Sequence, residues 1–202
     1  MSCVSEIAAS IGINCASPIV AGYTGREILI PYSISPIIVK DADNPRIVRS
    51  LTLPTGAKVA KVENLFTTPF EGSSQASNGD NGRMMATKTA VLRVPLRGAD
   101  ASAEIVEPIL NSAEGYILLQ EMQDKSGIGS YRLLGLQQPL RATADGASQS
   151  EFENGGDTVL TLSCNESWWD CELRVDGSAE TPVTTDYLAT KAMFNTLWAA
   201  AL

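Results

Sequence analysis

Short apolar runs with the two-residue period of β-strands, separated by turn residues, are the feature of this sequence that most restricts its fold. The clearest case spans residues 66–96, where residues 77–82 hold two Asn-Gly pairs that accept the positive φ values of hairpin turns. On the return side, Ala90, Leu92 and Val94 alternate with more polar positions. The pattern predicts a long hairpin with one face in the core of a mainly β protein.

Two more hairpins are predicted. One joins residues 46–53 to residues 57–63 through a turn that contains Pro and Gly. The other joins residues 116–123 to residues 130–136 through Asp, Lys, Ser and Gly. Both pairs are therefore expected to lie side by side in a sheet.

Other strand candidates lie near the two ends of the chain. Pro31 and Pro36 interrupt the run 26–39, so we expect it at a sheet edge or crossing between sheets, because proline cannot donate to a central ladder. Residues 158–165 alternate with one apolar face, and residues 168–175 are a candidate partner strand.

Two helices are predicted after the long hairpin. Residues 100–113 carry a helical apolar stripe, which Pro108 is expected to kink. Residues 186–202 lack Gly and Pro and carry only two charges, beside Tyr187, Phe194 and Trp198. Such an apolar helix would need a covering partner. The predicted parts are an N-terminal arm at 1–24, a β domain at 25–183 and a C-terminal interaction helix at 184–202.

The absence of histidine from all 202 residues argues against the common catalytic arrangements. Histidine is the usual general base and the commonest metal ligand, so Ser-His-Asp and Cys-His mechanisms are excluded. A carboxylate mechanism that uses Glu151 and Glu153 is a third and weaker hypothesis beside the two given below. The chain is otherwise expected not to be an enzyme.

Charge is unevenly distributed along the chain. Residues 1–100 hold 8 acidic and 10 basic side chains, whereas residues 101–202 hold 15 and 5. An acidic surface repels nucleic acid, although it suits a wall that DNA must slide past without adhering. No apolar run approaches the length of a membrane-spanning helix, so no membrane span is expected.

The four cysteines do not have the spacing of a structural zinc site, so no metal is expected. The sequence also lacks the Gly-rich motif that binds nucleotide phosphates, and no cofactor is expected. They are Cys3, Cys15, Cys164 and Cys171, and in a cytosolic chain we expect reduced thiols.

Several side chains are candidates for contacts between copies of the chain. Arg83, Lys88 and Arg93 cluster near the long hairpin, and they are expected to contact the acidic half of a neighbouring copy rather than nucleic acid. Trp168 and Trp169 are adjacent, so on a strand one of them would point outward as an interface anchor. The predicted interface also includes Tyr187, Phe194 and Trp198 of the terminal helix.

Five segments, in this order along the chain, carry a family resemblance: residues 88–92, 105–110, 116–121, 131–135 and 157–162. Together they resemble tail-tube or tail-ring subunits of tailed-bacteriophage virions, over about residues 60–170. The resemblance implies a β-sandwich or half-barrel flanked by one helix. It also implies that copies close into a ring, and that the long hairpin and the arms contact adjacent rings.

The leading hypothesis is therefore a structural subunit of a phage tail tube or tail ring that assembles with itself around a DNA channel. Its expected partners are copies of itself, neighbouring tail or connector proteins, and DNA only as passing cargo. Its expected location is the host cytoplasm before assembly and the virion tail afterwards. The alternative is a β-sandwich that binds a receptor or carbohydrate, with Trp168, Trp169 or Tyr131 as its platform.

Overall fold

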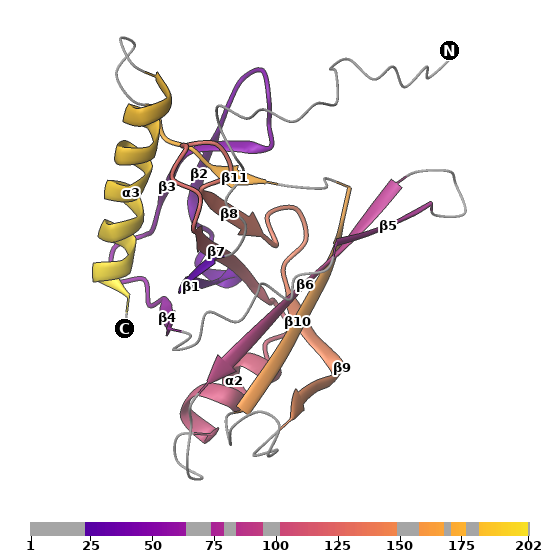
Figure 1. Cartoon of the computed structure of the whole chain (residues 1–202). Helices are drawn as coiled ribbons and strands as arrows, with labels where there is room; N and C mark the ends of the chain where they lie inside the picture. The colour runs from indigo at the N-terminus through magenta and orange to yellow at the C-terminus, as the bar shows by residue number, and fades with distance from the viewer. Residues whose placement is uncertain are drawn as a thin grey trace.

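Two β-sheets and a C-terminal helix stack as three layers in the computed structural model (Figure 1). The structure describes residues 23–63, 74–78, 84–94, 102–148, 158–167, 171–176 and 182–201. The middle layer is a seven-stranded sheet, sheet A, and the helix α3 (Pro182–Ala200) covers one of its faces. A four-stranded sheet, sheet B, covers the other face. The predicted mainly β sandwich with a C-terminal helix is confirmed.

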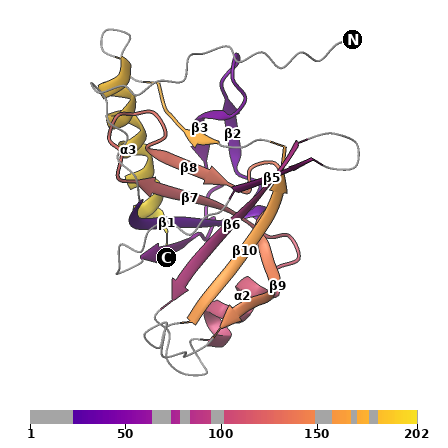
Figure 2. The same ribbon diagram turned by 45° about the vertical axis from the view of Figure 1, so that its right-hand side comes forward.

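The chain passes back and forth between the two sheets. Sheet A contains, in spatial order, β2 (Ile37–Lys40), β3 (Ile47–Thr52), β11 (Glu172–Leu173), β8 (Tyr131–Leu134), β7 (Tyr116–Met122), β1 (Tyr23–Pro31) and β4 (Ala60–Glu63). Sheet B contains, in spatial order, β5 (Ser74–Asn78), β6 (Met84–Val94), β10 (Thr158–Glu166) and β9 (Arg141–Ser148). Figure 2 shows the long strands of sheet B crossing those of sheet A.

The inner strands β1, β7 and β8 of sheet A are buried on both faces because they carry apolar residues at consecutive positions. In β1, Ile28 and Ile30 face the core beneath α3, whereas Leu29 faces sheet B. The same alternation in β7 places Leu119 beneath α3 and Leu118 against sheet B. A strand with two apolar faces is typical of the middle layer of a three-layer structure.

Sheet B contributes one apolar face, and short helical segments complete its core. Leu92 of β6 and Leu160 and Leu162 of β10 point toward sheet A and are fully buried. A π-helical turn, η2 (Ser102–Val106), continues into α2 (Glu107–Leu110), and Val106 and Ile109 pack into the same core. The helical segment predicted over residues 100–113 is therefore present, and it starts with this widened turn.

Three of the predicted elements are confirmed by the strand pairing and the core. β5 pairs antiparallel with β6, as predicted for the long hairpin, and β7 pairs antiparallel with β8. The apolar face predicted for residues 158–165 points into the core. The tip of the long hairpin lies outside the described residues.

Other predictions about pairing were wrong. β3 and β4 do not form a hairpin, because β3 pairs with β2 and β11 whereas β4 pairs with β1 at the far end of sheet A. β11 pairs with β3 and β8 rather than with β10. Turn residues indicate that the chain reverses, but long-range packing decides which strand lies beside which.

The run 26–39 divides into two strands with different positions. β1 lies inside sheet A between β7 and β4, and Pro31 is its last residue. A 3-10 turn, η1 (Tyr32–Ile34), then leads to β2, which lies at the edge of the sheet as predicted. The prediction of an edge position was therefore wrong for β1 because its proline falls at the strand end, where no ladder bond is lost.

Candidate assembly interface

The edge strand β2 presents exposed apolar side chains to solvent. Ile37 is 64% exposed and Val39 is 50% exposed, whereas Ile38 between them packs against the core beneath α3. Within the described residues, β2 pairs only with β3. Its other side therefore offers main-chain donors and acceptors beside an apolar surface, the combination that allows another strand to add to a sheet.

The opposite edge of sheet A is formed by β4, which has the same length as β2. β4 pairs with β1 alone among the described strands. Val62 and Ala60 lie on the face toward sheet B, and Lys61 and Glu63 are exposed. The succession of antiparallel pairs and one parallel pair across sheet A makes β2 and β4 run in opposite directions.

The aromatic face of α3 packs on the chain itself, which corrects part of the predicted interface. Phe194 is fully buried, with its ring centre 5.1 Å from that of Tyr131. Trp198 stacks on Phe194 at 5.9 Å, and Tyr187 stacks on Tyr131 at 6.3 Å. The sequence indicated that the helix needs a cover, and sheet A is that cover. Phe194 is therefore not available to a partner, whereas Tyr187 and Trp198 are half-buried.

A polar cluster fixes the same helix to sheet A. Arg26 donates to Glu121 at 3.1 Å and to Asn195 of α3 at 3.1 Å. Thr24 and Tyr131 also donate to the Glu121 carboxylate, at 3.0 and 3.2 Å. Burial and the nearby Glu121 carboxylate raise the pKa of the Tyr131 phenol. Tyr131 is fully buried, so it cannot serve as the binding platform that the alternative hypothesis assigned to it.

Lys88 is also buried, which corrects its prediction as an interface residue. Its Nζ atom lies 2.5 Å from Oε2 of Glu166, and both side chains are almost completely enclosed. Lys88 is in phase with Ala90 and Leu92 on the inner face of β6, so the alternation of the strand points it inward. The prediction relied on the positive charge of Lys88 and overlooked that its position in the strand alternates with the outward-facing residues.

For the remaining predicted residues the structure does not describe the side chains. Arg93 pairs with Val159 through the β6–β10 ladder, and its side chain lies outside the described part of the structure. Arg83, Trp168 and Trp169, and the carboxylates Glu151 and Glu153, also lie outside the described residues.

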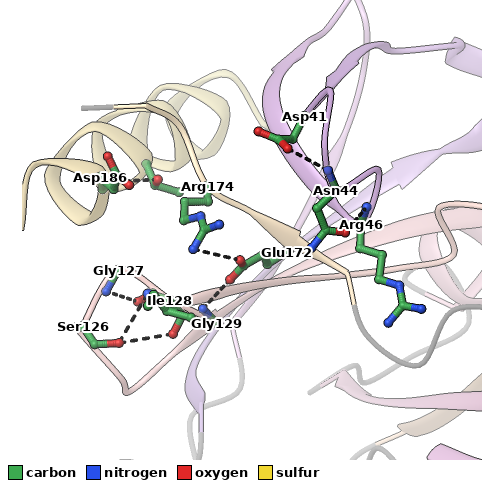
Figure 3. A network of polar contacts seen from close by, with 12 residues as sticks. Asp41, Asn44, Arg46, Ser126, Gly127, Ile128, Gly129, Glu172, Arg174 and Asp186 are labelled. Atoms are coloured by element: carbon green, nitrogen blue, oxygen red, sulfur yellow. Dashed lines mark hydrogen bonds and ion pairs between the residues drawn. The ribbon is translucent and has the colours of Figure 1, made fainter. Parts of the chain in front are cut away.

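Glu172 connects the tip of the β7–β8 hairpin to strand β11 (Figure 3). Its carboxylate accepts the backbone N–H of Gly129 and lies 3.5 Å from the Arg174 guanidinium. Within the tip, the Ser130 hydroxyl accepts the N–H of Gly127 at 3.0 Å. These contacts tie the hairpin tip to β11 and leave Ile128 exposed to solvent.

Sequence reasoning missed Ile37 and Val39 as candidate interface residues. The signal was present, since a β-branched run that follows Pro36 and ends at Asp41 is typical of an edge strand. The described part of the chain holds no cluster of three possible metal ligands, and none of its helices is long and apolar enough to cross a bilayer.

Comparison with known proteins does not assign the chain to a family. No protein-family model, no curated protein and no solved structure matches it.

Proposed function

We propose that this chain is a structural subunit of a phage tail tube or tail ring, which assembles head to tail with copies of itself around a DNA channel. The observation that supports this proposal best is that no other described strand covers the outer edge of β2 or of β4 in sheet A. β2 and β4 are strands of four residues each at opposite ends of the sheet. Each pairs on one side only within the described residues.

The geometry of these edges favours a head-to-tail contact. Because β2 and β4 run in opposite directions, β2 of one copy would pair antiparallel with β4 of the next and continue the sheet. Ile37 and Val39 would then lie on the same face as Ala60 and Val62, so apolar side chains meet across the junction. A heterologous contact of this kind, repeated between identical copies, produces a ring when the rotation closes.

The charge of the chain is compatible with DNA as passing cargo. The formal net charge is -8, and Glu104, Glu107 and Glu114 are exposed around η2 and α2. Acidic side chains do not neutralise phosphates, so such a surface would not retain duplex DNA. In this proposal the neighbouring tail or connector proteins contact the long hairpin and the terminal arm, and the assembled subunit resides in the virion tail.

Light scattering and negative-stain microscopy of the purified chain test the proposal. We expect the wild type to form closed oligomers, and the double variant Ile37→Lys, Val39→Lys to be a folded monomer, because two charges at an open edge prevent strand addition. Leu188→Lys is the matched control, since Leu188 is 57% exposed but lies on α3, and it should leave assembly unchanged. A wild type that stays monomeric at high concentration, or a double variant that still forms rings, would contradict the proposal.

Deletion of α3 is a poor test of the same idea. The helix supplies Phe194 and Leu197 to the main core, so its removal would expose the face of sheet A and unfold the chain. Loss of assembly after truncation would then report on folding rather than on the interface.

A further inference from the structure

Lys88 and Glu166 form the most enclosed charged pair among the described residues. The exposed fractions of their side chains are 1% and 0%, whereas every other ion pair recorded in the described part of the chain has a partner at least 20% exposed. Burial of two charges is costly in free energy even when they are paired. The surroundings of this pair would therefore favour any change that removes its two charges.

The contact brings a nucleophilic nitrogen next to a carboxyl group. Nζ of Lys88 lies 2.5 Å from Oε2 of Glu166. Neither atom makes a hydrogen bond to another group in the described part of the structure. The amine is therefore committed to this one carboxyl group.

The other carboxyl oxygen is held by main-chain donors. Oε1 of Glu166 accepts the backbone N–H of Gln137 at 2.7 Å and that of Gln138 at 3.4 Å. Two fixed N–H groups on one oxygen stabilise the negative charge that develops there when a nucleophile adds to the carboxyl carbon. The arrangement combines the nucleophile, the electrophile and an oxyanion site.

The fold holds all three parts in place. β6 and β10 are paired over their length, with Lys88 opposite Cys164 and Glu166 opposite Ala86, so the two side chains are diagonal neighbours on the inner face of sheet B. Segment 137–138 follows β8, and Gln137 also accepts the N–H of Ser167 at 3.0 Å. Fixing reactants in contact in this way raises their effective concentration greatly.

We propose that Lys88 and Glu166 condense to an intramolecular amide cross-link between β6 and β10. One proton moves from the ammonium of Lys88 to Oε2 of Glu166, which gives an amine and a carboxylic acid. The amine nitrogen then attacks Cδ, a new C–N bond forms, the Cδ–Oε2 bond breaks, and Oε2 leaves as water with two protons that came from the nitrogen. No oxidant, cofactor or other reactant is consumed.

The cross-link changes the buried ion pair into a neutral amide and ties the long hairpin to the centre of sheet B. It closes the chain between residues 88 and 166 into a covalent loop, which restricts the unfolded chain as a disulfide does. The bond contains no sulfur, so reducing conditions would not reverse it.

Mass spectrometry of the folded, full-length chain tests the cross-link directly. After incubation at 37 °C, we expect the denatured wild type to be lighter than its sequence by the mass of one water molecule. Tryptic digestion should leave the chain uncleaved after Lys88 and yield a branched peptide that joins Lys88 to Glu166, while cleavage after the exposed Lys61 is normal. The matched control is Lys88→Arg, which keeps the positive charge but should retain the full mass.

If Lys88→Arg does not fold, the mass and the tryptic cleavage of the wild type are sufficient to test the cross-link. A wild type with the full sequence mass and normal cleavage after Lys88 would show that the pair is an ordinary ion pair, and would overturn the inference. The result does not depend on assembly, so the cross-link and the proposed ring stand or fall separately.

Discussion

The guanidinium of Arg26 lies 4.6 Å from the centre of the Trp198 ring and joins strand β1 of sheet A to the C-terminal helix. The same group donates to Glu121 of β7 and to Asn195 of α3. One side chain therefore contacts α3 through a cation–π contact and one hydrogen bond, while a second hydrogen bond joins it to the neighbouring strand β7. This arrangement explains why the helix packs on its own chain in a fixed orientation.

Arg26→Met is expected to lower the free energy of unfolding by about 1–2 kcal/mol, because it removes the cation–π contact and leaves the buried Glu121 carboxylate without its cation. Urea denaturation followed by tryptophan fluorescence measures the change. Lys61→Met is the control, since Lys61 lies 5.9 Å from the same ring on the exposed side. A loss as large for Lys61→Met as for Arg26→Met would show that the hydrogen bonds of Arg26 to Glu121 and Asn195 contribute nothing.

Two glycines with the same φ angle allow the cost of backbone strain to be measured apart from the cost of a steric clash. Gly56 and Gly115 both have φ of +78°, but a Cβ at Gly115 would lie 2.4 Å from the carbonyl oxygen of Leu140, whereas a Cβ at Gly56 would meet no atom within 4 Å. Gly56→Ala should cost about 1 kcal/mol through the left-handed backbone alone. Gly115→Ala should cost at least about 3 kcal/mol, because the backbone at Leu140, just before β9, must also move to make room for the new methyl group. Equal losses in urea denaturation would contradict this reasoning.

Local sequence pattern was sufficient for the elements whose partners are close in the chain. The β5–β6 and β7–β8 hairpins follow from alternation and turn residues, and α3 follows from a long run free of Gly and Pro. Strand order was not predictable in this way. β3 and β4 are consecutive in sequence, but β4 forms one edge of sheet A and β3 lies next to the other edge, because each is placed by contacts with distant strands.

For the buried charges, too, the sequence predicts the local direction of a side chain but not its distant partner. Lys88 and Glu166 are in phase with the apolar positions of their strands, so their inward direction was readable from the sequence. That they would meet was not readable, because it depends on the register between β6 and β10. The strand β9 was missed for a related reason: residues 141–148 are small and polar and carry no clear alternation.

Burial raises the pKa of the Cys164 thiol to about 12. The unfolded chain releases this proton at about pH 8.5. Between these pH values the folded state holds a proton that the unfolded state has lost, so stability falls as the pH rises, by at most about 1.4 kcal/mol per pH unit. Cys164→Ala should flatten this alkaline decline in urea denaturation measured from about pH 8 to about pH 10. An unchanged slope would mean that the thiol does not contribute to it.

The turn that supports the edge strand β2 depends on one carboxylate, Asp41. Its Oδ1 atom accepts the backbone N–H of Asn44 at 2.8 Å, and its Oδ2 atom lies 2.7 Å from Arg49, which also contacts Asp176 after β11. The N–H of Asn44, followed by the Arg49 guanidinium, holds the pKa of Asp41 below its usual value. The carboxylate therefore stabilises the fold at neutral pH, and this contribution is lost as the pH falls through the lowered pKa.

Asp41→Asn is accordingly expected to destabilise the chain at neutral pH, and its difference from the wild type should shrink as the pH falls below about 4. Thermal unfolding at a series of pH values measures this difference. Asp43→Asn is the control on the same turn, because Asp43 takes part through its backbone N–H, which the substitution keeps. If the turn orders β2, Asp41→Asn should also weaken assembly at neutral pH while Asp43→Asn does not. A difference from the wild type that persists unchanged at low pH would show that the charge of Asp41 is not what holds the turn.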